Sequence, residues 1–196
     1  MTTGDRLRSY MDSRQFDGGE LRSFIVRYWP AILIVALIAL AAGLRLWDLG
    51  ARSIHHDESI HIKFAWDIVK GGAYTHDPVY HGPFQYYGIA ATFFVFGDND
   101  YTSRLFSALF GIALVGLPFL LRRQIGTLGA VLAAGLLAVS PALIYFSRFA
   151  RNDMYVAFFT LAIVVCIWRY MEERKNGWLI AIAPLLALSF AAKEVT

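Results

Sequence analysis

The sequence predicts an all-α polytopic membrane protein with about five transmembrane helices and a long external first loop that carries short interfacial helices. Hydrophobic residues make up 57% of the 196-residue chain, and charged residues make up 17%, below the roughly 25% usual for soluble domains. The apolar residues form several runs of about 20, long enough to span a bilayer. The charged residues cluster between these runs. A soluble all-α protein is the alternative, which the length of the runs disfavours.

Five apolar runs are the predicted spans, at about 29–46, 101–121, 126–146, 154–168 and 178–192. Trp29 and Trp47 flank the first of them and are typical interfacial anchors. The segment 88–96 is apolar but short, so we expect a helix that lies in the membrane interface. The chain is therefore predicted to consist of a tail at 1–28 and a transmembrane module at 29–196.

The distribution of arginine and lysine predicts the orientation. Five arginines precede the first span, Arg122 and Arg123 follow the second, and a charged group at 169–175 follows the fourth. The positive-inside rule places these groups in the cytoplasm, at a plasma membrane. The N-terminus is then cytoplasmic, and loop 48–100 is external. This topology gathers a set of charged residues on the external face, namely Asp57, Glu58, Asp153, Lys193 and Glu194.

Several classes of protein do not fit this sequence. The net charge is +3, and no basic face suited to nucleic acid is present. Mid-span charges and inverted repeats, which are common in transporters and channels, are lacking. The polar segment 1–27 lacks the pattern of a cleavable signal peptide. The single cysteine, Cys166, rules out an intrachain disulfide and lies in an apolar run.

The stretch His55-His56-Asp57-Glu58-Ser59 holds the first candidate catalytic groups. All five histidines lie in the same loop, at 55, 56, 61, 76 and 81. Apolar spacing over 60–69 predicts that a short helix follows. A carboxylate such as Asp57 is able to act as a general base on an acceptor hydroxyl. The structural alternative is that Asp57 caps a helix beginning near Ser59.

A divalent metal site is a second hypothesis for this stretch. Asp57 and His61 are four residues apart and share a helical face, with His55 and His56 nearby. Such side chains bind zinc and other divalent ions. The sequence contains no HExxH spacing to support this hypothesis.

A third group of candidates lies at the predicted outer ends of later spans, namely Arg148, Arg151, Asp153 and Lys193. Arginine binds phosphate through paired hydrogen bonds, so this group is a candidate site for a lipid phosphate or pyrophosphate. Asp153 would then orient an arginine or a metal. The structural alternative is that the cations anchor lipid headgroups or snorkel to the interface.

These motifs together resemble a known family. HHDES is followed by a short helix and then by YHGPFQYYGIAATFFVFGDNDYTSRLFSALFG, LAVSPALIYFSRFARNDM and AAKE. Their order and spacing over about 44–194 are similar to the N-terminal module of GT-C glycosyltransferases, in particular the dolichyl-phosphate-mannose protein mannosyltransferase superfamily. Within that superfamily, the chain resembles the aminoarabinose transferase-like and flippase-activity-associated proteins.

The resemblance implies roles for the acidic residues. Asp57 matches the family's proposed base, which activates the acceptor, and Glu58 matches its acidic partner. Asp153 matches the acidic position of the second external loop. Glu194 belongs to a Lys-Glu pair at the outer end of a later helix.

The resemblance also implies substrate-binding residues, namely Tyr80, His81, Arg148, Arg151 and Lys193. Arg148 and Arg151 lie in the loop motif of Asp153, and Lys193 precedes Glu194. Tyr80 and His81 lie where the family has His-Pro-Pro and aromatic residues. Gly82 stands in place of the first proline.

The implied activity is transfer of a sugar from a polyprenyl-phosphate donor to an acceptor outside the membrane. The leaving group is already a phosphate, so we expect no nucleotide or redox cofactor. The adjacent Asp57-Glu58 pair resembles the metal-independent branch, and a divalent metal is the alternative. The sugar and the acceptor stay open, since protein hydroxyls, lipids and glycans all fit.

Family members are longer, so we expect this chain to be the N-terminal module of such an enzyme and to need further spans or a partner subunit for activity. The alternative is a non-catalytic membrane subunit of a complex that handles lipid-linked sugars.

Overall fold

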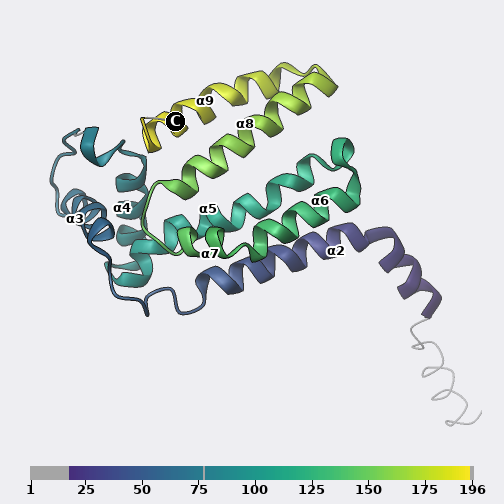
Figure 1. The fold of residues 1–196 in the computed structure, drawn as a ribbon, viewed down its shortest axis with the longest axis horizontal. Helices are drawn as coiled ribbons and strands as arrows, with labels where there is room; N and C mark the ends of the chain where they lie inside the picture. The colour runs from purple at the N-terminus through teal and green to yellow at the C-terminus, as the bar shows by residue number, and fades with distance from the viewer. Residues whose placement is uncertain (1–17, 77, 195–196) are drawn as a thin grey trace, which may run out of the picture. The chain divides into compact units, whose positions relative to one another are not determined.

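Helices form the regular structure of the residues that the computed structural model describes, which are 18–76 and 78–194 (Figure 1). Among these residues there is no strand. By length and composition, three of the described helices are able to cross a membrane, and a bent pair of helices raises this number to four. The protein is therefore an all-α polytopic membrane protein, as the sequence predicts.

Three candidate spans confirm the first, second and fourth predicted ones. They are α2 (Gly18–Leu46, with the spanning part at Arg27–Leu46), α5 (Asp100–Leu120) and α8 (Asp153–Glu173). The fifth predicted span corresponds to α9 (Asn176–Ala192), which has 17 residues and is about 25 Å long. Since an average hydrocarbon core is about 30 Å thick, α9 is at the lower limit for a spanning helix.

The chain divides into two compact units, Met1–Leu33 and Ile34–Thr196. The first unit contributes the start of α2, and the second contains the rest of α2 and all later helices. Most of the predicted tail lies outside the described residues, so the boundary after residue 28 stays a prediction.

The predicted third span, 126–146, is not one straight helix. α6 (Arg122–Val139) and α7 (Pro141–Ser147) meet at an angle of 58°. Pro141 has no N–H to donate to the preceding turn, so it ends α6 and occupies the first turn of α7. The Ser140 hydroxyl caps α7 by accepting a hydrogen bond from the Leu143 N–H at 3.5 Å.

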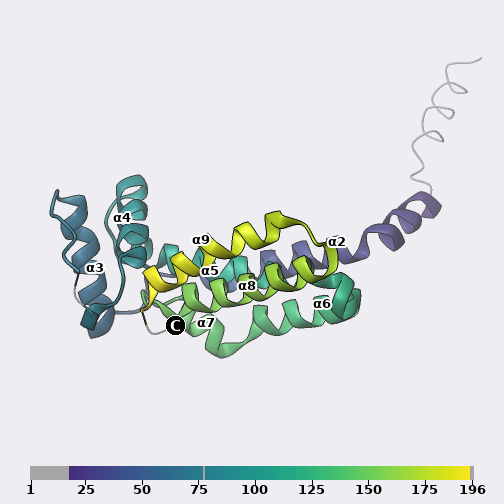
Figure 2. The same cartoon turned by 90° about the horizontal axis from the view of Figure 1, so that it is seen from above.

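Two shorter helices, α3 (His56–Val69) and α4 (Phe84–Phe96), run across the axes of α5, α8 and α9 at one end of the second unit (Figure 2). α3 confirms the short helix predicted from 60–69, and α4 extends the predicted 88–96 helix by one turn. α4 has 13 residues and is about 20 Å long, too short to span. Its location in the membrane interface stays a prediction.

The alternative in which Asp57 caps a helix beginning near Ser59 is wrong. α3 begins at His56, and its N-cap is His55, whose Nδ1 accepts a hydrogen bond from the Asp57 N–H at 3.2 Å. The Glu58 carboxylate accepts a bond from the His55 N–H at 3.0 Å, which completes a capping box. Because His55 caps the helix, the Asp57 carboxylate is left to make contacts outside it.

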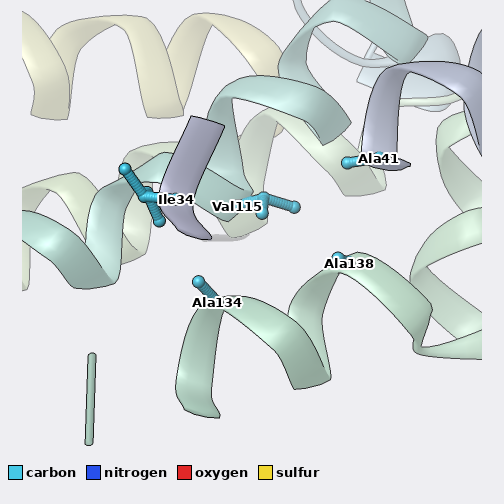
Figure 3. Packing of buried hydrophobic residues seen from close by; sticks show 5 residues of the cluster. All are labelled: Ile34, Ala41, Val115, Ala134 and Ala138. Carbon is cyan, nitrogen blue, oxygen red and sulfur yellow. The ribbon is translucent and has the colours of Figure 1, made fainter. Parts of the chain in front are cut away.

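Small residues allow α2, α5 and α6 to approach closely within the second unit. Ile34, Ala41, Val115, Ala134 and Ala138 form a buried cluster (Figure 3). Ala134 and Ala138 lie one turn apart on the same face of α6. Such alanines let helix backbones come close together in membranes.

An aromatic cluster joins α4, α5, α8 and α9. Tyr155, Phe159 and Ala192 are its buried centre, and Phe84 and Phe106 are among the residues packed against it. The rings of Phe84 and Tyr155 lie 5.4 Å apart. This packing places the start of α8 beside the end of α9, next to the first turn of α4.

Candidate active site

Four charged side chains that the sequence singled out meet at the end of the second unit where α3 lies. Arg151 Nη1 is 3.3 Å from Asp57 Oδ2, and Arg151 Nε is 3.6 Å from Asp153 Oδ2. Lys193 Nζ is 3.6 Å from Asp153 Oδ1. These residues come from the first turn of α3, the loop between α7 and α8, the start of α8 and the residue after α9. We call them the charged cluster.

The charged cluster is open to ligands. Between 28% and 44% of the surface of each side chain is exposed. Its Asp57 and Asp153 carboxylates alternate with the cations Arg151 and Lys193. Such an arrangement offers a base for a hydroxyl proton and positive groups for a phosphate at the same place.

Glu58 lies beneath the cluster and is fully buried. Its Oε1 accepts hydrogen bonds from Arg104 Nε at 2.8 Å and from the Ala150 N–H at 3.0 Å. Its Oε2 accepts bonds from Arg104 Nη2 at 2.8 Å and from the His55 N–H at 3.0 Å. Burial raises the pKa of Glu58, but these hydrogen bonds outweigh burial and hold the pKa below its ordinary value.

The Ala150 peptide is held from two sides, and this fixes the loop that carries Arg151. Its N–H donates to Glu58 on α3, and its C=O accepts a hydrogen bond from Gln85 Nε2 on α4 at 2.6 Å. Both side chains are fully buried. The position of Arg151 beside Asp57 therefore depends on polar contacts with α3 and α4.

Sequence reasoning missed Arg104 and Gln85. Arg104 also donates to the carbonyls of Leu49, Arg52 and Ser53 at 2.8–3.2 Å, so it holds the segment before α3. The available signal was an arginine one turn inside an apolar run, since a charge there needs a buried partner. Gln85 gave no comparable signal, because a glutamine near a helix start is common.

His61 lies one turn after Asp57 on α3 and is also buried. Its Nδ1 is 3.3 Å from the Tyr86 hydroxyl. The pKa of His61 is lowered to about 4, mainly by burial and also by the charges of His81 and Arg151, while Asp57 and Asp153 act in the opposite direction. His61 is therefore a neutral neighbour of the charged cluster at neutral pH.

The other predicted site residues lie elsewhere. Arg148 donates to the carbonyls of Leu44, Trp47 and Asp48 at 2.7–3.0 Å, so it caps the end of α2. Glu194 Oε1 is 2.9 Å from His76 Nε2. Tyr80 and His81 line a cavity between α3 and the segment that follows it.

Gly82 has a structural explanation. A Cβ atom at this position would lie 2.1 Å from the Ala191 carbonyl oxygen near the end of α9. Any side chain, including that of proline, would push the backbone at Gly82 away from α9. The close approach of Gly82 to the Ala191 carbonyl explains why this chain has glycine where the family that it resembles has proline.

The described part of the chain contains no set of ligands that supports the metal hypothesis. Within residues 18–76 and 78–194, no group of at least three His, Cys, Asp or Glu side chains is arranged to hold a metal ion. The preference for a metal-independent reaction stays a prediction.

Known proteins that resemble the chain include a family and a bacterial relative. The family described as dolichyl-phosphate-mannose-protein mannosyltransferase matches residues 71–193. An uncharacterised protein of Aquifex aeolicus (strain VF5) is 29% identical over 169 residues, which cover 80% of this chain and 33% of that protein. The chain thus spans about a third of this relative's length. No solved structure matches the chain significantly.

Proposed function

Because the chain belongs to the dolichyl-phosphate-mannose-protein mannosyltransferase family, we propose that it forms the acceptor-activating part of a membrane glycosyltransferase. The donor is a polyprenyl-phosphate-linked sugar, and the acceptor is a hydroxyl compound at the external face of the plasma membrane. The observation that carries this proposal is the meeting of Asp57, Arg151, Asp153 and Lys193 in one charged cluster.

In the proposed reaction Asp57 is the general base. Its carboxylate takes the proton of the acceptor hydroxyl while the acceptor oxygen bonds to the anomeric carbon of the donor sugar. The bond between that carbon and the phosphate oxygen breaks, and the polyprenyl phosphate leaves with the electron pair. The reaction balances without a nucleotide or a redox cofactor.

Arg151 and Lys193 bind the phosphate of the donor in this proposal. Negative charge grows on the phosphate as the bond breaks, and nearby cations stabilise it. Asp153 contacts both cations, at 3.6 Å in each case, and acts as their positioning residue. Glu58 acts through Arg104 and the Ala150 peptide, which hold the base and the phosphate-binding loop together.

The experiment measures donor binding and sugar transfer separately, in nanodiscs that contain the chain. Polyprenyl phosphate is the binding probe, and a radiolabelled polyprenyl-phosphate sugar is the substrate. We expect Arg151→Gln and Lys193→Gln to weaken binding of the probe about tenfold, as expected for loss of a charged hydrogen bond. Lys70→Gln, at an exposed lysine just after α3 and outside the charged cluster, is the matched control.

Unchanged binding in both cluster variants would contradict the phosphate assignment. If the probe binds to the chain but labelled sugar is never transferred, the non-catalytic subunit becomes the better description of this chain.

A further inference from the structure

A cavity of about 140 Å³ lies between α3 and residues that follow it, at 73–75 and 80–81. The aromatic side chains of Phe64, Tyr74, Tyr80 and Tyr86 form much of its wall, and Asp67 and His81 add polar groups. The ring of Phe64 lies 5.4 Å from that of Tyr80 and 5.5 Å from that of Tyr86. The cavity is smaller than the roughly 300–1,000 Å³ of pockets for drug-sized ligands, so it suits a single ring.

The cavity and the charged cluster share one face of α3. Asp57, His61, Phe64 and Ile68 follow one another at helical spacing. Asp57 belongs to the charged cluster, while Phe64 and Ile68 line the cavity. His61 contacts the cavity residue Tyr86 and interacts electrostatically with Asp57. The two sites are therefore neighbours along α3.

We propose that this cavity binds a sugar ring of the acceptor, one or two units beyond the hydroxyl that Asp57 activates. A sugar ring has apolar C–H faces that pack on aromatic rings and a rim of hydroxyl groups that donate hydrogen bonds. The Asp67 carboxylate only accepts hydrogen bonds, so it matches those hydroxyls. This inference rests on the glycosyltransferase function proposed above and narrows the acceptor to a glycan.

The lining distinguishes a sugar from other ligands of similar size. No lysine or arginine is among the described residues that line the cavity, and Asp67 would repel a phosphate. A purely apolar ligand would not use the Asp67 carboxylate, whose side-chain partner among the described residues is the exposed Lys63. Exposed pairs of this kind contribute little and are easily rearranged around a bound hydroxyl.

The spacing assigns the ring to the acceptor. Seven residues separate Asp57 from Phe64, which is about 10 Å along a helix axis. Reacting atoms must approach to about 3 Å, so the transferred donor sugar lies against Asp57 itself. A ring beside Phe64 is then part of a molecule that extends away from the reacting hydroxyl.

The test measures binding of a mannose disaccharide to the chain in nanodiscs by saturation-transfer NMR. We expect Asp67→Asn and Phe64→Leu each to raise the dissociation constant about tenfold, because each removes one contact with the ring. Lys63→Gln removes the partner of Asp67 but leaves its carboxylate, and it is the matched control. Disaccharide binding is measured without sugar transfer, so failure of this proposal is distinguishable from failure of the catalytic one.

Three results would overturn the inference. The first is no binding of the disaccharide to the wild-type chain. The second is equal binding by wild type and both cavity variants. The third is that the cavity variants bind the disaccharide normally but bind another probe more weakly. Weaker binding of a serine-containing peptide would assign the cavity to a protein acceptor. Weaker binding of polyprenyl-phosphate mannose would assign it to the donor sugar.

Discussion

Asp57 and Glu58 are adjacent in the sequence but lie in opposite environments. Glu58 is fully buried under four hydrogen bonds, whereas 44% of the Asp57 side chain is exposed next to Arg151. Neighbouring residues on a helix point about 100° apart, so one faces the interior and the other the surface. The proposed roles follow from this difference: Asp57 contacts the acceptor, and Glu58 positions the groups around it.

The buried pair of Glu58 and Arg104 should be essential for stability. We expect Glu58→Gln to lower the free energy of unfolding by about 3–5 kcal/mol, because it leaves the Arg104 guanidinium buried without its counterion. Thermal melting in detergent micelles measures the change. Lys63→Gln disrupts the exposed pair with Asp67 and should cost at most about 1 kcal/mol. Equal effects of the two variants would contradict the burial argument.

His61 should make the fold sensitive to acid. Its pKa is about 4 in the folded chain against an ordinary value of 6.5, so the unfolded chain binds more protons between these pH values. Stability is then fully retained above pH 6.5 and falls as the pH drops toward 4, by on the order of 3 kcal/mol. His61→Gln should reduce this loss when melting temperatures are compared from pH 7 to pH 4. A wild-type curve with the same slope as the variant would contradict it.

Sequence reasoning found the charged cluster but not its support. The charge pattern of the loops predicted that Asp57, Arg151, Asp153 and Lys193 lie at one end, and the structure brings them into contact. The sequence analysis also grouped Arg148 with these residues, although the Arg148 guanidinium caps α2. Topology tells which end a residue occupies, whereas the partner of a long side chain depends on packing within a few ångströms.

At the level of helices, two arginines stabilise the junctions around the α6–α7 bend. The buried Arg45 of α2 donates to the carbonyls of Leu137 and Ala138 at 2.9 and 3.1 Å, at the end of α6. Arg148, just after α7, donates in turn to carbonyls at the end of α2. Carbonyls at helix ends have no helical partner, so Arg45 caps α6 and Arg148 caps α2.

Gly111 on α5 provides the space for this junction. A Cβ there would lie 2.5 Å from Ser147 Cβ and 3.0 Å from Arg45 Nε. We expect Gly111→Ala to lower the unfolding free energy by about 1–3 kcal/mol through overpacking. Gly116, also on α5, has only Ile38 Cδ1 nearby at 3.8 Å, so Gly116→Ala should be neutral or stabilising by up to about 1 kcal/mol. Melting of the two variants side by side tests this, and a destabilised Gly116→Ala would contradict it.

The helices themselves were largely predictable because runs of apolar residues end at charged or glycine-rich segments. The bend at Ser140 and Pro141 was missed, although a proline inside an apolar run is a known signal for it. The His55 cap was missed because histidine is an unusual N-cap, and the acidic residues after it are the commoner candidates.

For the whole molecule, the predicted topology puts the charged cluster outside the cell. Ala51 lies in the loop between α2 and α3, and Asn176 is the first residue of α9. Both residues are exposed. In a Cys166→Ala background, we expect Ala51→Cys to react with a membrane-impermeant maleimide in intact cells. Asn176→Cys should react only after the membrane is permeabilised. The opposite labelling pattern would contradict the orientation.

The chain is much shorter than the relative that it matches. The chain covers 33% of the Aquifex aeolicus protein and holds the proposed base together with the cations proposed to bind phosphate. A larger enzyme of this family would add its remaining contacts to donor and acceptor around this centre. Asp57 therefore keeps its proposed role as the base, whatever surrounds it.

The most direct test is sugar transfer by the Asp57→Asn variant, measured beside binding of the polyprenyl-phosphate donor. Asparagine keeps the shape of the side chain but cannot take the proton. We predict that transfer falls at least about 100-fold, as for loss of a general base, while the dissociation constant of the donor stays unchanged. Asp98→Asn, at the start of the turn before α5, is the matched control. Unchanged transfer in Asp57→Asn would contradict the assignment of Asp57 as the base.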